Sequence, residues 1–359
     1  MNRPIGARLF RDDRPLELEF GGQLARLEVA YETWGRLSHR RDNAILIVPA
    51  FSGHSHAASH DGDPSPGWWE GMIGPRLAFD TDRYFVICPS ALGASFGSTG
   101  PQSHRPSEEE SSPRAYGSSF PVISIRDSVE AYVRLLDHLR IDRLACAAGG
   151  SMGGMATLEL GIRHPGRVAK VLSASATDRT RPYTAAIRHL GRRAILLDPG
   201  YGTPEGPSSG LALAREIGTL FYRSRDEFNQ RFRWQPLRKP ELGKVTFDVQ
   251  SYLRHQGTKI LGSYDAAAYL ILSMAMDLHD VWRDFPSREA ALEPVEAEFL
   301  IAGVDEDRLI PIDEQEWLHH ALLSAGIRSS WRPISSHIGH DTFLVDLDQM
   351  TGLVHELLG

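Results

Sequence analysis

The stretch LACAAGGSMGGM, residues 144–155, joins an apolar, strand-like run to a glycine–X–serine–X–glycine turn, and a helix-like run at residues 156–162 follows. In this strand–turn–helix context the serine lies on a strained bend, with its hydroxyl exposed at the carboxyl edge of a sheet. Gly149 and Gly153 lie where a side chain would collide with the neighbouring strand or helix. The context matters because the bare motif can recur by chance in a glycine-rich chain. We therefore predict that Ser151 is a nucleophile.

Composition indicates an ordinary globular protein. The chain has 359 residues, of which 42% are hydrophobic and 24% charged. The net charge is −7, with 39 basic and 46 acidic residues and no basic block, so we expect neither nucleic acid nor an anionic membrane as a partner. Residues 1–6 lack the apolar core of a signal peptide, and we expect a cytoplasmic protein. Cys88 and Cys146 lie in apolar runs, which favours buried, reduced thiols.

Short β-rich runs alternate with helical runs in two parts of the chain. Strands are predicted over residues 25–31, 44–49, 84–88, 144–149, 169–176, 297–303 and 328–333, and helices over residues 125–139, 312–325 and 341–358. Ser124 and Asp127 have the spacing of a capping box at the start of the first helix. The alternation predicts a mostly parallel sheet covered on both faces.

Strand signals vanish between about residues 179 and 293. Helical runs are predicted over residues 183–197, 210–222, 225–232, 247–261 and 265–275. We interpret this segment as a helical lid over the carboxyl edge of the sheet, where ligands of open α/β sheets bind. The predicted core is formed by residues 1–178 and 294–359, and the lid by residues 179–293. Residues 101–119, rich in Ser, Pro and Glu, are predicted to form a long surface loop.

Candidate partners of Ser151 follow the last two predicted strands. A serine hydroxyl needs a histidine to accept its proton and a carboxylate to orient that histidine. The candidate acids are Asp305, Glu306 and Asp307, and the candidate bases are His337 and His340. The chain order serine, acid, histidine is one that known triads use. Position alone leaves both choices open.

An oxyanion hole requires two backbone N–H groups near the nucleophile. One would belong to Met152, directly after the serine, and the other to Phe51, in the loop after the strand at 44–49. Three histidines in this region, His54, His56 and His60, raise the alternative of a metal site. Their spacing matches no zinc pattern closely, so we expect no metal.

Further characteristic motifs are distributed over about residues 27–358 of the chain. They are residues 29–35 (VAYETWG), 66–70 (PGWWE), 73–75 (IGP), 79–88 (FDTDRYFVIC), 97–101 (GSTGP), 149–155 (GGSMGGM), 210–215 (GLALAR) and 339–341 (GHD). Together they resemble the homoserine/serine O-acyltransferases of the α/β-hydrolase superfamily. The resemblance implies an α/β-hydrolase fold with a mostly parallel central sheet and a helical lid. It also implies acyl transfer from an acyl-CoA to an amino-acid hydroxyl, with no bound cofactor.

The resemblance assigns roles that position alone leaves open. It implies that Asp307 is the acid and His340 the base. It implies that Arg215 binds the substrate carboxylate and that Asp341 binds the substrate amino group. A planar guanidinium suits a carboxylate because it can donate two parallel hydrogen bonds.

Two departures from the family pattern concern the substrates. Homoserine acetyltransferases typically have His-Ala-Leu-Thr where this chain has Pro49, Ala50, Phe51 and Ser52. The bulk of Phe51 would shorten the amino-acid pocket and favour serine over homoserine, by roughly 1–3 kcal/mol for one methylene. Arg188, with Arg181 nearby, replaces a small polar residue and could pair with the free carboxylate of a succinyl group.

These features predict a serine O-succinyltransferase of cysteine biosynthesis that acts by a ping-pong mechanism with succinyl-CoA as co-substrate. One alternative is a homoserine O-acetyltransferase of methionine biosynthesis that uses acetyl-CoA. Another is an esterase or thioesterase with the same triad, which would have no reason to keep Arg215 and Asp341. The resemblance also implies a homodimer.

Overall fold

The computed structural model describes residues 3–105 and 115–359, so part of the loop predicted at 101–119 lies outside the described residues. The main sheet has eight strands. In spatial order they are β1 (Arg8–Asp12), β4 (Leu27–Trp34), β8 (Phe85–Pro89), β5 (Ala44–Val48), β9 (Cys146–Gly150), β10 (Lys170–Ala174), β11 (Glu298–Val304) and β12 (Ser329–Ile334). The pairings β1–β4 and β4–β8 are antiparallel and the other five are parallel. All seven predicted strands are present, and β1 is an eighth strand that the sequence pattern does not predict.

Four short strands form two small ribbons outside this sheet. They are β2 (Leu16–Glu17) with β3 (Gln23–Leu24), and β6 (Ile73–Gly74) with β7 (Phe79–Asp80).

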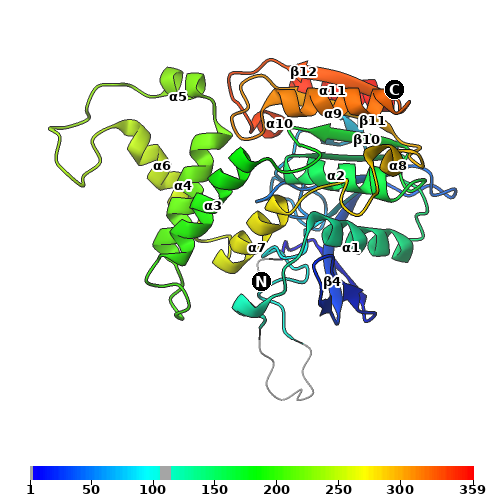
Figure 1. Cartoon of the computed structure of the whole chain (residues 1–359), viewed down its shortest axis with the longest axis horizontal. Helices are drawn as coiled ribbons and strands as arrows, with labels where there is room; N and C mark the ends of the chain where they lie inside the picture. Colours follow the sequence, from blue (N-terminus) through cyan, green and yellow to red (C-terminus); the bar gives the residue numbers. More distant parts are fainter. Residues whose placement is uncertain (1–2, 106–114) are drawn as a thin grey trace.

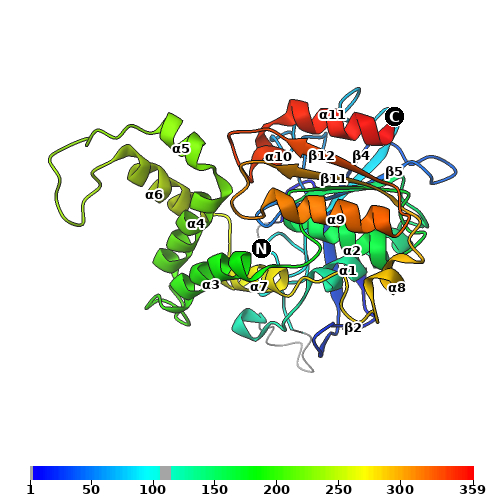
Figure 2. The ribbon, with the colours of Figure 1, turned by 45° about the horizontal axis from the view of Figure 1, so that its top comes forward.

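Alternating side chains of the strands supply the cores on the two faces of the sheet. In β5, Leu46 and Val48 belong to one buried cluster, whereas Ile45 and Ile47 belong to the other, as the two-residue period of a strand requires. Helices α1 (Ile125–His138), α2 (Met152–Arg163) and α9 (Ile312–Ser324) pack on the first face, and α11 (Leu347–Leu358) packs on the second. Figure 2 shows α11 on one side of the strands and the other three helices on the opposite side. The predicted α/β-hydrolase fold is confirmed.

Capping groups set two helix boundaries. The capping box predicted for α1 is present: Ser124 Oγ accepts from the N–H of Asp127 at 3.1 Å, and Asp127 Oδ2 accepts from the N–H of Ser124 at 2.8 Å. The single helix predicted over residues 341–358 is wrong, because it is divided into α10 (Thr342–Val345) and α11. Asp346 separates them, since its backbone leaves the helical region and its side chain caps α11.

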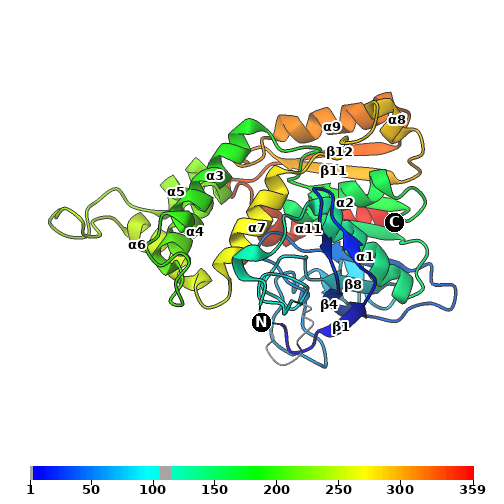
Figure 3. The ribbon, with the colours of Figure 1, turned by 60° about the horizontal axis from the view of Figure 1, so that its bottom comes forward.

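The five predicted lid helices are present. They are α3 (Pro182–Leu196), α4 (Ser208–Tyr222), α5 (Arg225–Arg231), α6 (Asp248–Ile260) and α7 (Ala266–Asp277). Figure 1 shows α5 and α6 projecting away from the sheet, and Figure 3 shows α7 between α3 and the core. The short helix α8 (Arg288–Leu292) lies beside α2 in the core (Figure 2), and a 3₁₀ turn spans Gly117–Ser119. The lid boundaries at 179 and 293 stay a prediction.

Both cysteines are free and buried, as predicted. Burial raises the pKa of the Cys146 thiol to about 12 and the pKa of Cys88 well above its ordinary value. No helix within residues 3–105 and 115–359 is both long and apolar enough to cross a membrane.

Candidate active site

Ser151 occupies a strained turn between β9 and α2. Its φ and ψ angles are 55° and −123°, a conformation that is rare for residues other than glycine. The N–H of Ser151 donates to the carbonyl of Ala174 on β10 at 2.9 Å, which fixes the turn at the carboxyl edge of the sheet. A Cβ atom on Gly153 would collide with the carbonyl oxygen of Val48, so glycine is required there. The helix begins at Met152, four residues before the run predicted from the sequence.

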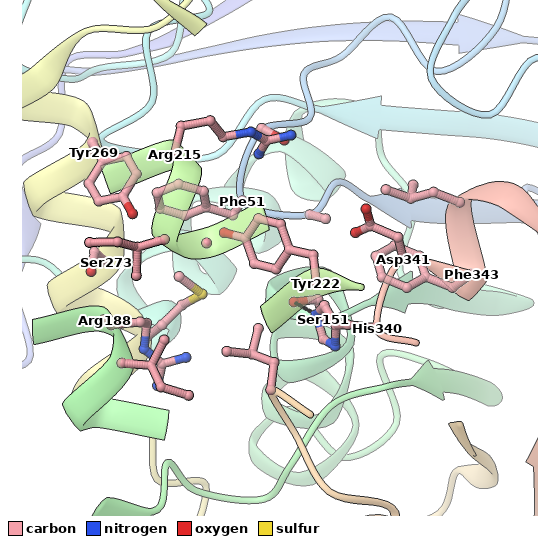
Figure 4. Close-up of a pocket in the computed structure, with 18 residues that line it drawn as sticks. Phe51, Ser151, Arg188, Arg215, Tyr222, Tyr269, Ser273, His340, Asp341 and Phe343 are labelled. Carbon is pink, nitrogen blue, oxygen red and sulfur yellow. Dashed lines mark hydrogen bonds between the residues drawn. The ribbon is translucent and has the colours of Figure 1, made fainter. Parts of the chain in front are cut away.

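His340 connects the serine to a carboxylate. Its Nε2 lies 2.8 Å from Ser151 Oγ (Figure 4). Its Nδ1 lies 2.6 Å from Asp307 Oδ2. Asp307 Oδ1 accepts the N–H groups of Leu309 and Ile310, both at 2.9 Å. These two donors fix the orientation of the carboxylate. Because Asp307 Oδ2 faces His340 Nδ1 as an acceptor, the imidazole proton lies on Nδ1 and Nε2 is free to accept the serine proton. All three side chains are buried.

The other candidate acids and bases lie elsewhere. Asp305 is exposed and accepts the N–H of Ser336 at 3.0 Å, so it holds its own loop in place. Glu306 and His337 are both exposed. The structure therefore brings only Asp307 and His340 to Ser151.

Two acidic neighbours shape the pKa of His340. Burial acts to lower it, but the charge and hydrogen bond of Asp307 and the charge of Asp341 oppose this, and the pKa is raised above its ordinary value. The pKa of Asp341 is also raised, because burial outweighs the attraction of Arg223.

Two backbone donors beside the serine have no partner. Neither the N–H of Phe51 nor that of Met152 has a hydrogen-bond acceptor among the described residues. Met152 is the first residue of α2, where the helix dipole favours negative charge. This arrangement can stabilise an oxyanion formed next to Ser151.

The serine opens into a cavity of about 90 Å³ between the lid and the sheet. The lining residues are Ala50, Phe51, Ser52, Ser151, Ile187, Arg188, Arg215, Ile217, Gly218, Tyr222, Tyr269, Ser273, Met276, Leu309, His340, Asp341, Phe343 and Leu344. Pro49, from the predicted specificity loop, is buried at the end of β5 and is not among them. A cavity of this volume suits small acyl and amino-acid groups.

Comparisons with known proteins agree with this geometry. Residues 43–321 match the model of the alpha/beta hydrolase fold family. The homoserine O-acetyltransferase of Thermobifida fusca is 41% identical, over 96% of this chain and 91% of the relative. The serine O-succinyltransferase of Litchfieldella anticariensis is 39% identical, over 99% of both chains.

The chain belongs to the homoserine/serine O-acyltransferase family of α/β-hydrolases. It is therefore an O-acyltransferase. Among solved structures it is similar to a homoserine O-acetyltransferase from Bacillus anthracis, with a TM-score of 0.90 and 27% identity over 99% of this chain and 98% of that one. It is also similar to esterase E22, with a TM-score of 0.88 and 26% identity over 98% of this chain and 99% of that one.

The guanidinium group of Arg215 has no acidic side chain as an ion-pair partner among the described residues. Its side chain lines the cavity and lies over the ring of Tyr222 at 5.4 Å, with no carboxylate partner in the described part of the chain. Asp341, by contrast, is paired with Arg223, whose Nε lies 3.2 Å from Asp341 Oδ2. The other oxygen, Oδ1, has no hydrogen-bond partner within residues 3–105 and 115–359 and can accept from a ligand.

The two arginines predicted to select the acyl group differ in position. Arg188 is only 8% exposed and lines the cavity, where its Nε pairs with Asp277 at 2.6 Å. Arg181 pairs with Asp178 at 2.9 Å and does not line the cavity. Arg188 therefore lies in the wall of the cavity and not on the outer surface of α3.

Several lining residues are not predicted from the sequence. Tyr222 at the end of α4, and Tyr269 and Ser273 on α7, all face the cavity (Figure 4). Helical periodicity gives each helix an apolar face, but it does not say whether that face meets the core or a ligand.

The loop that carries the histidine is attached to the lid. The N–H of Ser224, after α4, donates to the carbonyl of Ile338 at 2.9 Å, and the N–H of Asp341 donates to the carbonyl of Tyr222 at 3.2 Å. Gly339 lies between Ile338 and Asp341 in this loop. Its φ angle is 93°, and a Cβ atom there would collide with the backbone of Ser224. Glycine is therefore required at position 339 by the contact with the lid.

A cluster of Glu32, His56 and His60 lies outside the cavity, with potential ligand atoms within 4.8 Å of one another. Glu32 Oε2 lies 2.7 Å from His56 Nδ1 and 2.8 Å from His60 Nε2. His60 Nδ1 accepts the N–H of Gly62 at 3.0 Å, which places the proton of a neutral His60 on Nε2. His56 Nε2 faces the carbonyl of Ser65 at 2.8 Å and must donate to it. His60 then has no lone pair free for a metal, so the contacts fit a hydrogen-bonded network better than a metal site.

Proposed function

We propose that this acyltransferase moves a succinyl group from succinyl-CoA to the hydroxyl of L-serine. In the first half-reaction His340 accepts the proton of Ser151, whose Oγ attacks the thioester carbonyl. The N–H groups of Phe51 and Met152 bind the oxyanion. The C–S bond then breaks, and the CoA thiolate leaves with the proton that His340 returns. Asp307 holds the imidazole in its tautomer and stabilises its cation.

The second half-reaction uses the same groups in reverse. L-Serine enters, His340 accepts its hydroxyl proton, and the oxygen attacks the acyl-enzyme ester. The bond to Ser151 Oγ breaks, Ser151 regains a proton from His340, and O-succinylserine leaves. Water competes for the same ester, and enclosure by the lid suppresses that hydrolysis.

The unpaired guanidinium of Arg215 carries the proposal of an amino-acid acceptor. A cation without a carboxylate in a partly buried cavity matches the carboxylate of serine. Asp341 Oδ1 is free to accept a hydrogen bond from the amino group. An esterase would gain nothing from these two groups.

Two observations support serine and succinyl-CoA over homoserine and acetyl-CoA. The ring of Phe51 lines the cavity and packs 4.9 Å from the ring of Tyr269, so its bulk is fixed on the acceptor side. Arg188 places a second buried cation on the cavity wall, which a succinyl carboxylate can approach. Identities of 41% and 39% to relatives of the two kinds do not separate them.

Release of free CoA thiol tests the proposal in a four-way assay of acetyl- or succinyl-CoA with L-serine or L-homoserine. We expect the highest kcat/KM with succinyl-CoA and serine. A preference for acetyl-CoA and homoserine would support the alternative transferase. Thiol release that does not depend on either amino acid would support a thioesterase.

The remaining parts of the proposal concern the location of the enzyme, the pathway that uses its product and its oligomeric state. We place the enzyme in the cytoplasm and its product in cysteine biosynthesis, and we propose a homodimer. Light scattering of the purified protein tests the last point, since a monomer mass would contradict it.

A further inference from the structure

Arg223, between α4 and α5, contacts the carboxylate of Asp341 from behind the wall of the cavity. Its Nε lies 3.2 Å from Asp341 Oδ2, and its Nη1 donates to Glu227 Oε1 at 3.3 Å. Asp341 lines the cavity of Ser151, whereas Arg223 does not. The side chains of Arg223, Asp341 and Glu227 are only 19%, 19% and 14% exposed. One guanidinium group is therefore shared between a carboxylate of the cavity wall and a carboxylate of α5.

Backbone hydrogen bonds fix Arg223 relative to the loop that carries His340. The two neighbours of Arg223 in sequence both bond to that loop, Tyr222 through its carbonyl and Ser224 through its N–H. The N–H of Glu227 donates to Ser224 Oγ at 2.9 Å, where α5 begins. Arg223 and its two carboxylate partners thus extend from one hydrogen-bonded unit. Little conformational freedom is lost when these side chains pair.

The two oxygens of Asp341 differ in their surroundings. Oδ2 faces Arg223, while Oδ1 has no hydrogen-bond partner in the part of the chain that the structure describes. Burial raises the pKa of Asp341, and Arg223 is the strongest influence that opposes this. Without Arg223 the carboxylate could rotate, and burial would favour its neutral form, which attracts an ammonium group far less.

We infer that Arg223 is a positioning residue for the acceptor, because it holds the Asp341 carboxylate with Oδ1 toward the amino group of the bound amino acid. Glu227 fixes the guanidinium group in turn. Arg223 acts through Asp341 and does not touch the substrate itself. An acceptor without an amino group would gain nothing from this arrangement. The inference rests on the proposed amino-acid acceptor.

The test uses Arg223→Gln, Asp341→Asn and the double variant. We expect Arg223→Gln to lower kcat/KM for L-serine by about ten-fold or more, mainly through KM, as the loss of a charge-assisted contact implies. Hydrolysis of p-nitrophenyl acetate, which needs the triad but no amino group, should fall much less. In the Asp341→Asn background the change at Arg223 should have little further effect, because the residue that it positions no longer carries a charge.

Two further variants serve as controls. Arg223→Lys, which keeps the charge, should recover part of kcat/KM for serine and shows whether the segment still folds. Arg225→Gln should behave as the wild type, because Arg225 is 75% exposed and pairs with Asp226.

The outcomes separate this inference from the proposed function. If ester hydrolysis falls as much as transfer to serine, or if Arg223→Gln has the same effect with and without Asp341→Asn, Arg223 only ties the lid to the loop and the inference is wrong. If Asp341→Asn raises KM for serine and Arg223→Gln does not, the inference is wrong and the proposed acceptor stands. If Asp341→Asn leaves KM for serine unchanged, the proposed binding of the amino group fails, and the inference fails with it.

Discussion

The hydroxyl of Tyr264 donates a hydrogen bond to the carbonyl oxygen of Phe51 at 2.8 Å, across 213 residues of sequence. Tyr264 lies between α6 and α7, so the lid helps to hold the loop whose Phe51 N–H we propose as an oxyanion donor. Their rings also stack, with centroids 5.5 Å apart.

We expect Tyr264→Phe to lower kcat by about three- to ten-fold, the usual effect of losing one neutral hydrogen bond. The ring contacts persist, so KM for serine and the melting temperature should change little. Steady-state kinetics with both substrates measure this. An unchanged kcat would show that the loop keeps its position without the lid tyrosine.

Asp307→Asn should lower kcat by about 10³- to 10⁴-fold, because the amide no longer selects the tautomer with the proton on Nδ1. KM should change much less, since Asp307 does not line the cavity. Glu306→Gln is the control, as Glu306 is an exposed neighbour in the same loop. Equal losses in the two variants would contradict the assignment of the acid.

The pH dependence of kcat/KM should follow His340. The base must be neutral to accept a proton, and its pKa is raised by Asp307 against the effect of burial. Activity should therefore fall on acidification with a midpoint above the ordinary histidine value of about 6.5. A pH profile in His337→Gln should be unchanged, since His337 is exposed. A midpoint below the ordinary value would exclude His340 as the titrating base.

Stability should depend on pH through His56. Burial acts to lower its pKa, but the contact with Glu32 outweighs this and raises it. A pKa that is higher in the folded state gives stability below the unfolded value of about 6.5, and this stability is lost as the pH rises through the folded value. We expect His56→Gln to lower the free energy of unfolding more at about pH 6 than at about pH 9. Urea unfolding at the two pH values measures the difference, and a larger loss at the higher pH would oppose this assignment.

Local patterns predict much of this molecule. The strand, glycine turn and helix around Ser151 are encoded within about a dozen residues. The alternation of strand-like and helical runs along the sequence predicts the order of the strands and helices that form the core. Strand β1 escapes prediction because its sequence, RLFRD, is polar and short, and pairing with β4 stabilises it.

Long-range contacts account for what the sequence does not reveal. Asp305, Glu306 and Asp307 share one loop, and only the position of His340, 33 residues beyond Asp307, distinguishes them geometrically. Arg188 can be buried because it pairs with Asp277, 89 residues later in the chain. No periodicity within α3 contains that information.

The attachment of the histidine loop to the lid at Ser224 and Tyr222 limits how the enzyme can admit its substrates. Moving this corner of the lid outward would pull Ile338 and Asp341 with it, and His340 lies between those two residues. A conformation opened at this corner would therefore have lost the proposed base. In the proposed mechanism, exchange of CoA for the amino acid would therefore require a passage or a motion elsewhere in the lid, so that the acyl-enzyme keeps His340 in place until the acceptor binds.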